Sequence, residues 1–190
     1  MTRELYARGF THMTGIDHAQ AMLDAARRDG PDDLTYLHAD MASFTAETPF
    51  DKMFSLFSSF GHAYDDENEA YLRQMAANLV SGGRCLIDIV SPYYAIRAFK
   101  EHVVYEHDGV PCEVRNSLDL VHSTTTSVFT AQPPGQDPVT FTYTARFYMV
   151  TELDALLRKH GLTTTAVYGG YAKEPLTLDS TRLVVVARKD

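Results

Sequence analysis

The sequence has few cysteines and no recognisable metal-binding motif, and both absences exclude classes of protein. Only two cysteines, Cys85 and Cys112, occur among its 190 residues, and they form no CxxC motif. The eight histidines show neither HExxH nor Cys/His spacing, so a structural zinc site is not expected. We expect a reduced, cytoplasmic protein that holds no metal.

Clustered cations and long apolar segments are also lacking. The chain carries 17 Lys and Arg against 25 Asp and Glu, a formal net charge of -8, and it has no run of basic residues. Because phosphate groups are bound by clustered cations, neither a nucleic acid nor an anionic membrane is an expected partner. No apolar stretch has the character of a signal sequence or the length of a membrane span. The expected partner is a small molecule, and a homodimer remains open.

Apolar residues are plentiful enough for one folded domain. Hydrophobic residues make up 45% and aromatic residues 11% of the chain, which is a globular composition. No internal repeat or low-complexity tract divides the sequence. We expect residues 1–190 to form a single domain.

Residues 12–30, HMTGIDHAQAMLDAARRDG, have the pattern of a short apolar strand that ends on an acid and runs into a helix. In nucleoside-binding α/β folds an acid at such a strand tip accepts both hydroxyl hydrogens of a ribose, the role expected of Asp17. The helix has one apolar stripe at i, i+3, i+4 and i+7, formed by Ala19, Met22, Leu23 and Ala26. Nucleoside binding is the first hypothesis. The alternative is an ordinary strand–helix unit with a solvent-facing Asp17.

Helices alternate with strands through residue 90, and the pattern then changes. The predicted strands are Thr11–Asp17, Leu34–Ala39, Phe50–Phe57 and Arg84–Val90, the last after a turn at Ser81-Gly82-Gly83. The predicted helices are Met1–Gly9, the one ending at Gly30, and Asp65–Leu79. Such alternation predicts a three-layer α/β sandwich with ligands at the C-terminal strand tips.

Between Val103 and Met149 apolar and polar residues alternate with a period of two, which indicates a half-buried antiparallel sheet. Turns at 109–111 and 132–135 separate three expected strands. A helix with a capping-box-like start at Thr151 ends at Gly161. Two closing strands are expected at Leu162–Tyr168 and Arg182–Ala187.

The order and spacing of these motifs resemble the class I S-adenosylmethionine-dependent methyltransferases. Four stretches carry the resemblance: ARGFTHMTGIDHAQAML, LHADM, FDKMFSLFSSFGHA, and the tail from FYMVTELDALLRKHGL to DSTRLVVVARK. It implies a Rossmann-like sandwich with a mostly parallel sheet, an antiparallel last strand and an antiparallel β insertion, about residues 100–149, that covers the acceptor site. The implied activity is methyl transfer from S-adenosyl-L-methionine to N or O of a small-molecule acceptor, with S-adenosyl-L-homocysteine as the second product.

The resemblance also implies cofactor-binding residues at three strand tips. The acid after the family's second strand holds the ribose, and the next residue lies against the adenosine, which correspond to Asp17 and His18. An acid and its apolar neighbour after the third strand hold the adenine, which correspond to Asp40 and Met41. The tip of the fourth strand faces the methionine part and the methyl group, and it corresponds to Leu56, Phe57 and Ser58, with Ser59 one step further.

The family pattern is not complete. The family's first strand and glycine-rich loop would stand immediately before Met1 and are absent from this sequence. That strand is central in the family's sheet, so its absence would leave two neighbouring strands without hydrogen-bond partners and open a gap in the core. We consider an N-terminally incomplete sequence, a strand supplied by another segment or subunit, and a chain that no longer binds cofactor. The alternative function is accordingly a non-catalytic or truncated methyltransferase-like binding module. A nicotinamide dehydrogenase shares the strand–acid–helix unit but fits the closing segment and LHADM poorly.

Methyl transfer from a sulfonium needs alignment and exclusion of water more than covalent help. A phenol or alcohol acceptor benefits from a base with a pKa near neutrality, and His62, just after the fourth-strand tip, is the catalytic candidate. The alternative for His62 is a surface or capping histidine. Aromatic and basic residues near the expected acceptor pocket are candidate substrate-binding residues, and about half of them are expected to be structural: Tyr64, Tyr93, Tyr94, Tyr143 and Arg146.

The sequence leaves two roles open for each of two charged residues, Arg146 and Asp88. Arg146 pairs either with an acidic group of the acceptor or with a neighbouring acid. Asp88 interrupts an otherwise apolar strand, and a carboxylate is unusual in a buried run. It either makes a hydrogen bond inside the site or faces the edge of the insertion.

Overall fold

The computed structural model describes residues 2–10, 12–31, 34–62 and 64–190 of the chain. The predicted helix start at Met1, the strand start at Thr11 and residues 32–33, between the second helix and the second strand, lie outside the described residues. The chain forms three sheets with helices packed against two of them, and the α/β class predicted from the sequence is confirmed. No helix among these residues is long and apolar enough to cross a membrane.

The first part of the chain is a small parallel unit. It consists of α1 (Thr2–Ala7), β1 (Thr14–Asp17), α2 (Gln20–Asp29) and β2 (Thr35–His38). β1 and β2 pair in parallel, with Asp17 opposite His38. Of the apolar stripe predicted for α2, Leu23 is buried, whereas Met22 is 62% exposed and Ala19 is the cap residue before the helix. The strand–acid–helix unit is therefore present, with Asp17 as the last residue of β1.

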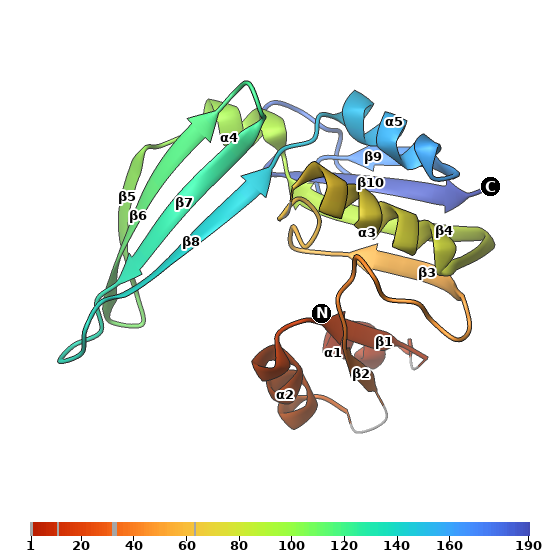
Figure 1. Ribbon diagram of the computed structural model, residues 1–190, viewed down its shortest axis with the longest axis horizontal. Coiled ribbons are helices and arrows are strands. Elements are labelled where there is room, and N and C mark those ends of the chain that lie inside the picture. Colours follow the sequence, from red (N-terminus) through yellow and green to blue (C-terminus); the bar gives the residue numbers. More distant parts are fainter. Residues whose placement is uncertain (1, 11, 32–33, 63) are drawn as a thin grey trace.

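A four-stranded sheet forms the centre of the molecule, in the order β3 (Phe50–Ser55), β4 (Leu79–Val90), β10 (Arg182–Lys189) and β9 (Leu162–Tyr168). β3 and β4 are parallel, whereas β10 is antiparallel to both of its neighbours, as predicted for the last strand. Helices α3 (Asp65–Ala77) and α5 (Val150–Lys159) lie together against this sheet (Figure 1). Their buried side chains meet those of the sheet in one core, whose fully buried members include Leu72, Met75, Ile87, Leu153, Leu157 and Leu183.

The insertion forms a separate antiparallel sheet beside the central one (Figure 1). It follows the short helix α4 (Pro92–Arg97) and contains β5 (His102–His107), β6 (Val110–Asp119), β7 (Thr124–Ala131) and β8 (Val139–Arg146). The prediction of three strands was wrong because a turn at 120–123 contains neither Gly nor Pro. Asp119 makes this turn instead, since its Oδ1 accepts hydrogen bonds from the backbone N–H groups of Val121 and His122.

Two further boundaries differ from the prediction. Residues 81–83 form no separate turn, because β4 already begins at Leu79 and the pairing with β3 shifts between Phe50–Leu79 and Lys52–Arg84. The extra residues are accommodated as a bulge, with Gly82 at φ 77°. Helix α5 begins one residue before Thr151, with Met149 at the cap position and no side-chain cap. The predicted capping box is therefore absent.

The gap expected beside β1 is present in the structure. β1 and β3 each form the edge of their sheet, and the described residues place no strand between them. In Figure 1 the unit of α1, β1, α2 and β2 lies below β3 and apart from the central sheet. Every residue of both strands lines one large cavity between the two sheets.

Candidate functional site

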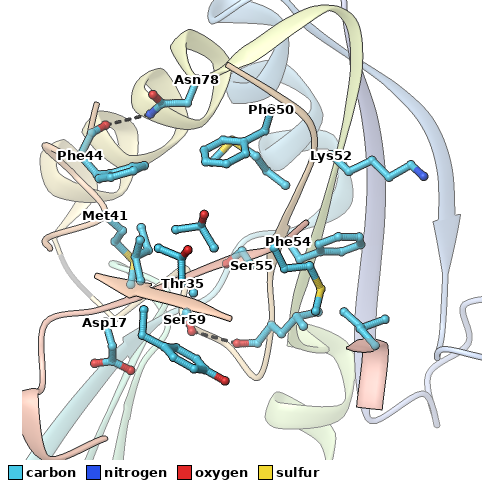
Figure 2. A pocket seen from close by; sticks show the side chains of 18 of the residues that line it. Asp17, Thr35, Met41, Phe44, Phe50, Lys52, Phe54, Ser55, Ser59 and Asn78 are labelled. Atoms are coloured by element: carbon cyan, nitrogen blue, oxygen red, sulfur yellow. Dashed lines mark hydrogen bonds between the residues drawn. The ribbon is translucent and has the colours of Figure 1, made fainter. Parts of the chain in front are cut away.

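A cavity of about 1080 Å³, which we name the larger cavity, lies between β1 and β3. Its walls also include the segment after β2, through Met41 and Phe44, and helix α3, through Met75. Figure 2 shows Met41, Phe44 and Phe50 around the space, with Asp17 at its edge. The cavity is therefore largely apolar, with a carboxylate at the tip of β1.

The Asp17 carboxylate is only partly used by the protein itself. Its Oδ1 accepts a hydrogen bond of 2.8 Å from the backbone N–H of Ala19, which starts α2. The ring of His18 lies 3.8 Å from the same oxygen. Among the described residues, no hydrogen bond reaches Oδ2, and the side chain is 39% exposed. Asp17 thus keeps an acceptor oxygen for a ligand.

The other residues predicted at the first two strand tips are placed differently. Met41 lines the larger cavity and packs against the core. His18 and Asp40 are not among the residues that line it. Asp40 is exposed, and its Oδ1 accepts a hydrogen bond of 2.8 Å from the N–H of Ala42. Contacts of His18 and Asp40 with adenosine stay predictions.

The chain reverses sharply at the tip of β3, in residues 56–59, which we name the tip turn. Phe57 (φ 55°) and Ser58 (φ 61°) both have left-handed backbone conformations. This conformation costs a non-glycine residue on the order of 1–2 kcal/mol. Two backbone hydrogen bonds hold it: the N–H of Phe57 donates to Oδ2 of Asp88 (2.8 Å), and that of Ser58 to the Asp88 carbonyl (3.0 Å). Strain of this kind is typical of functional sites.

The smaller cavity, of about 440 Å³, lies beyond the tip turn and under the insertion. It is lined by the end of β4, by α4 and by the inner face of β6, β7 and β8. The tip turn separates the two cavities, because Phe57 and Ser59 line the larger one and Ser58 lines the smaller one. The predicted residues Tyr94, Tyr143 and Arg146 all line the smaller cavity, whereas Tyr64, Tyr93 and the expected base His62 line neither.

His62 and Tyr143 connect the tip of β3 with the insertion. The hydroxyl of Tyr143 lies 3.0 Å from Nε2 of His62, and the two rings meet edge to face with centroids 4.7 Å apart. Partial burial of the ring lowers the pKa of His62, a backbone hydrogen bond with Ser58 raises it, and the charge of His18 lowers it, for a net decrease. His62 is therefore held neutral near pH 7 and is able to accept a proton.

Arg146 is occupied by neighbouring acids. Its Nε donates to Oδ1 of Asp65 (3.0 Å), its Nη2 to Glu152, and its guanidinium lies over the ring of Tyr148. The side chain is only 13% exposed. The structure thus shows the second of the two roles considered for Arg146, and contact with an acceptor stays a prediction.

The residue that sequence reasoning did not assign is Asp88, although its position in an apolar strand was the signal. Its side chain is fully buried and also accepts hydrogen bonds from Nε of Arg182 (2.6 Å) and from the hydroxyl of Tyr171. Burial, and then the hydrogen bond to Asp88, raise the pKa of Tyr171 to about 12, so Tyr171 remains a donor. Asp88 thus connects the tip turn with β10 and the loop that precedes it.

Comparison with known proteins identifies the fold. Residues 1–83 match the family model described as a methyltransferase domain. No curated protein matches the chain at a significant level. One similar solved structure is the CcbJ methyltransferase from Streptomyces caelestis, with a TM-score of 0.85, 18% identity, and coverage of 97% of this chain and 77% of that one.

Two sugar-modifying enzymes are also similar in structure. CalS10, an amino pentose methyltransferase from Micromonospora echinaspora solved with S-adenosylmethionine bound, has a TM-score of 0.70 and 21% identity, over 98% of this chain and 78% of that one. The sugar N-methyltransferase KedS8 from Streptoalloteichus has a TM-score of 0.73 and 22% identity, over 98% and 75%. At these identities the likeness shows the fold, which is that of S-adenosylmethionine-dependent methyltransferases, as the resemblance predicted.

Proposed function

We propose that this chain, which has the fold of S-adenosylmethionine-dependent methyltransferases and matches the methyltransferase-domain model over residues 1–83, transfers a methyl group to a nitrogen or oxygen atom of a small molecule. The observation that carries the proposal is the pair of cavities that meet at the tip turn. The larger cavity has a carboxylate suited to a ribose, and the smaller one has a histidine–tyrosine pair beside it. A donor and an acceptor would each have a cavity of their own.

The residues of the larger cavity fit a nucleoside. Oδ2 of Asp17 is available to accept hydrogen bonds from ribose hydroxyl groups, and Met41 and Phe44 offer an apolar surface for a base. When bound there, S-adenosylmethionine supplies an electrophilic methyl group on a sulfonium. Phe57 and Ser59 present the tip turn to that cavity.

His62 and Tyr143 are the residues expected to act on the acceptor. The lowered pKa of His62 leaves its ring neutral, and its Nε2 meets the hydroxyl of Tyr143, so a proton from an acceptor hydroxyl or ammonium group would reach His62 through Tyr143. Tyr143 lines the smaller cavity and holds Nε2 of His62 through its hydroxyl group. Proton removal by a positioned base typically contributes about 10²–10⁴-fold to the rate.

An amino sugar is the acceptor class that the smaller cavity favours. Its wall carries hydroxyl groups of Tyr94, Thr125 and Tyr143 among apolar residues, which suits a polyhydroxylated ring. Two further polar residues of the wall, Asn116 and Ser127, are hydrogen-bonded to each other. Two structurally similar enzymes act on sugars, an amino pentose methyltransferase and a sugar N-methyltransferase. Both facts support an aminated sugar over a flat aromatic acceptor.

A second candidate function is a binding module without catalysis. The observation that favours it is the break between β1 and β3, which leaves the larger cavity open along two unpaired strand edges. A nucleoside held by Asp17 at such a site would have fewer contacts than one enclosed on all sides. The two candidates differ in whether the larger cavity is complete enough to bind S-adenosylmethionine.

Isothermal titration with S-adenosylhomocysteine separates the two candidates. We expect the folded, monodisperse protein to release heat, and Asp17→Ala to abolish it because the ribose loses its acceptor. Asp24→Ala is the matched control, since Asp24 is an exposed acid on α2 that pairs with Arg27 on the surface. Heat from the control but not from Asp17→Ala supports the enzyme. No heat from the wild-type protein would leave the binding module, and heat with NAD in place of S-adenosylhomocysteine would point to a dehydrogenase.

A further inference from the structure

Asp88 is a fully buried carboxylate in the middle of the central sheet. It lies on β4 opposite Val184 of β10, among apolar neighbours. A carboxylate in such a place is costly unless every lone pair it presents meets a donor. Its three side-chain partners are all donors: the N–H of Phe57, Nε–H of Arg182 and the hydroxyl of Tyr171. Both oxygens of Asp88 thus act as acceptors, Oδ1 for Arg182 and Oδ2 for Phe57 and Tyr171.

Two consecutive residues of the tip turn, Phe57 and Ser58, each donate their backbone N–H to residue 88. The N–H of Phe57 meets the carboxylate, and the N–H of Ser58 meets the main-chain oxygen of the same residue. A third bond closes the turn, because the N–H of Val90 donates to Oγ of Ser58 (3.0 Å). Of these bonds, only that of Phe57 requires the side chain of Asp88. Its loss would leave a strained residue without its anchor.

The position of the tip turn gives this anchor a consequence for the ligands. Phe57 faces the larger cavity and Ser58 the smaller one, so a group that passes from one cavity to the other passes this turn. The turn also bears on the base, because a backbone hydrogen bond with Ser58 contributes to the pKa of His62. A change in the turn would therefore alter the contacts of the sulfur-bearing end of a nucleoside donor. The contacts of the ribose would be unchanged, because Asp17 holds the ribose at a different strand tip.

We propose that Asp88 is a positioning residue that holds the tip turn, and through it the sulfur-bearing end of the methyl donor, without touching the donor itself. This inference rests on the proposed function. Arg182 balances the charge of Asp88 and keeps one carboxylate oxygen occupied, so that the other is directed at Phe57. Asp88 therefore acts on one part of the donor only.

Asp88→Asn tests the anchor. An asparagine has one acceptor oxygen, so its NH₂ group must face either the N–H of Phe57 or the guanidinium of Arg182, and both are donors. We expect the affinity for S-adenosylhomocysteine to fall about tenfold. The affinity for adenosine, which lacks the sulfur-bearing chain, should change less than about twofold, because Asp17 is untouched. Both affinities are measured by isothermal titration.

A rescue variant separates anchoring from simple charge balance. In Asp88→Asn/Arg182→Met the guanidinium is gone, so the asparagine oxygen is free to accept from Phe57 while its NH₂ group meets no donor. We expect S-adenosylhomocysteine affinity to recover to within about twofold of wild type. Leu157→Ala is the control for a general loss of stability, since Leu157 of α5 is fully buried in the core and lines neither cavity. It should lower the melting temperature and leave both affinities unchanged.

Each outcome decides between the two proposals. Equal weakening of S-adenosylhomocysteine and adenosine in Asp88→Asn, no weakening of either, or a double variant as weak as Asp88→Asn would overturn the role of Asp88 while leaving the proposed function in place. A wild-type protein that binds neither compound would overturn the proposed function and the inference built on it. Selective loss with rescue supports both.

Discussion

The hydroxyl of Tyr143 lies 3.0 Å from Nε2 of His62, although the two residues are 81 positions apart in the chain. This contact joins the insertion to the tip of β3 and places a tyrosine of the acceptor-side cavity against the expected base. The pair therefore connects the expected base with the wall of the cavity proposed for the acceptor.

The first prediction concerns the pH dependence set by His62. Its pKa is lowered below the ordinary value of 6.5, chiefly by burial. We expect the methyl-transfer rate to rise with pH around that lowered pKa, since only the neutral ring accepts a proton. Nuclear magnetic resonance of the ring protons gives the pKa directly. A midpoint at or above 6.5 would contradict the assignment.

The same shift predicts a change in stability. The native protein binds the His62 proton less readily than the unfolded chain does, so the unfolded state carries more protons just below pH 6.5. The free energy of unfolding should therefore decrease as the pH falls from 6.5 through the native pKa, and be unaffected by His62 above that window. Urea unfolding of the wild type and of His62→Asn checks this, and the variant should lose less stability over that range. If the free energies of unfolding of the two proteins change with pH in parallel, the lowered pKa of His62 is contradicted.

The second prediction concerns Tyr143. Tyr143→Phe keeps the ring that meets His62 edge to face but removes the hydroxyl that holds Nε2. We expect the transfer rate to an amino sugar to fall about tenfold, while binding of S-adenosylhomocysteine is unchanged. Tyr105→Phe is the control, since Tyr105 lies on β5 and lines neither cavity. Equal rates in the two variants would remove Tyr143 from the chemistry.

The third prediction compares the stability contributed by the ion pairs of the largely buried Arg146 with that of a surface ion pair. Arg146→Met removes a guanidinium that is 13% exposed and bridges Asp65 and Glu152. We expect unfolding to become easier by about 1–2 kcal/mol. Arg158→Met breaks an exposed pair with Asp154 one helical turn away, and it should cost less than about 0.5 kcal/mol. Urea denaturation measures both, and costs of the same size would show that the Arg146 network is no stronger than a surface pair.

Local patterns in the sequence were sufficient to predict most elements, and contacts between distant residues explain what was missed. The span of β9, Leu162–Tyr168, was predicted exactly as found, because its apolar residues lie between a helix-ending glycine and a polar loop. The turn at 120–123 was missed because a single side chain, Asp119, makes it. Composition alone does not distinguish such an aspartate from an exposed one.

The site shows the same limit more clearly. Asp17 was placed correctly at its strand tip because the signal, an acid between a strand and a helix, is local. The role of Asp88 depends on Phe57, 31 positions earlier, and on Arg182, 94 positions later. The sequence marked Asp88 as unusual, and only the assembled sheet identifies its partners.

The last prediction concerns the wall of the larger cavity formed by residues 44–46. Asn78, at the end of α3, is buried and holds this segment from both sides: its Oδ1 accepts from the N–H of Ala46 (2.7 Å), and its Nδ2 donates to the carbonyl of Phe44 (2.8 Å). Figure 2 shows the latter bond beside the cavity. Asn78→Asp keeps the acceptor but loses the donor, whereas Asn78→Ala loses both.

We therefore expect a graded response of the two Asn78 variants. Alanine leaves the N–H of Ala46 and the carbonyl of Phe44 without their partner, and should cost about 1–3 kcal/mol of unfolding free energy. Because Phe44 lines the cavity, adenosine affinity should fall along with stability, in contrast to the selective effect expected at Asp88. Asn78→Asp places a carboxylate oxygen against the Phe44 carbonyl, and the repulsion between the two oxygens should displace residues 44–46. The adenosine affinity of Asn78→Asp should therefore fall at least as far as that of Asn78→Ala. Calorimetry measures both quantities, and an unchanged adenosine affinity in both variants would show that residues 44–46 do not contact the nucleoside.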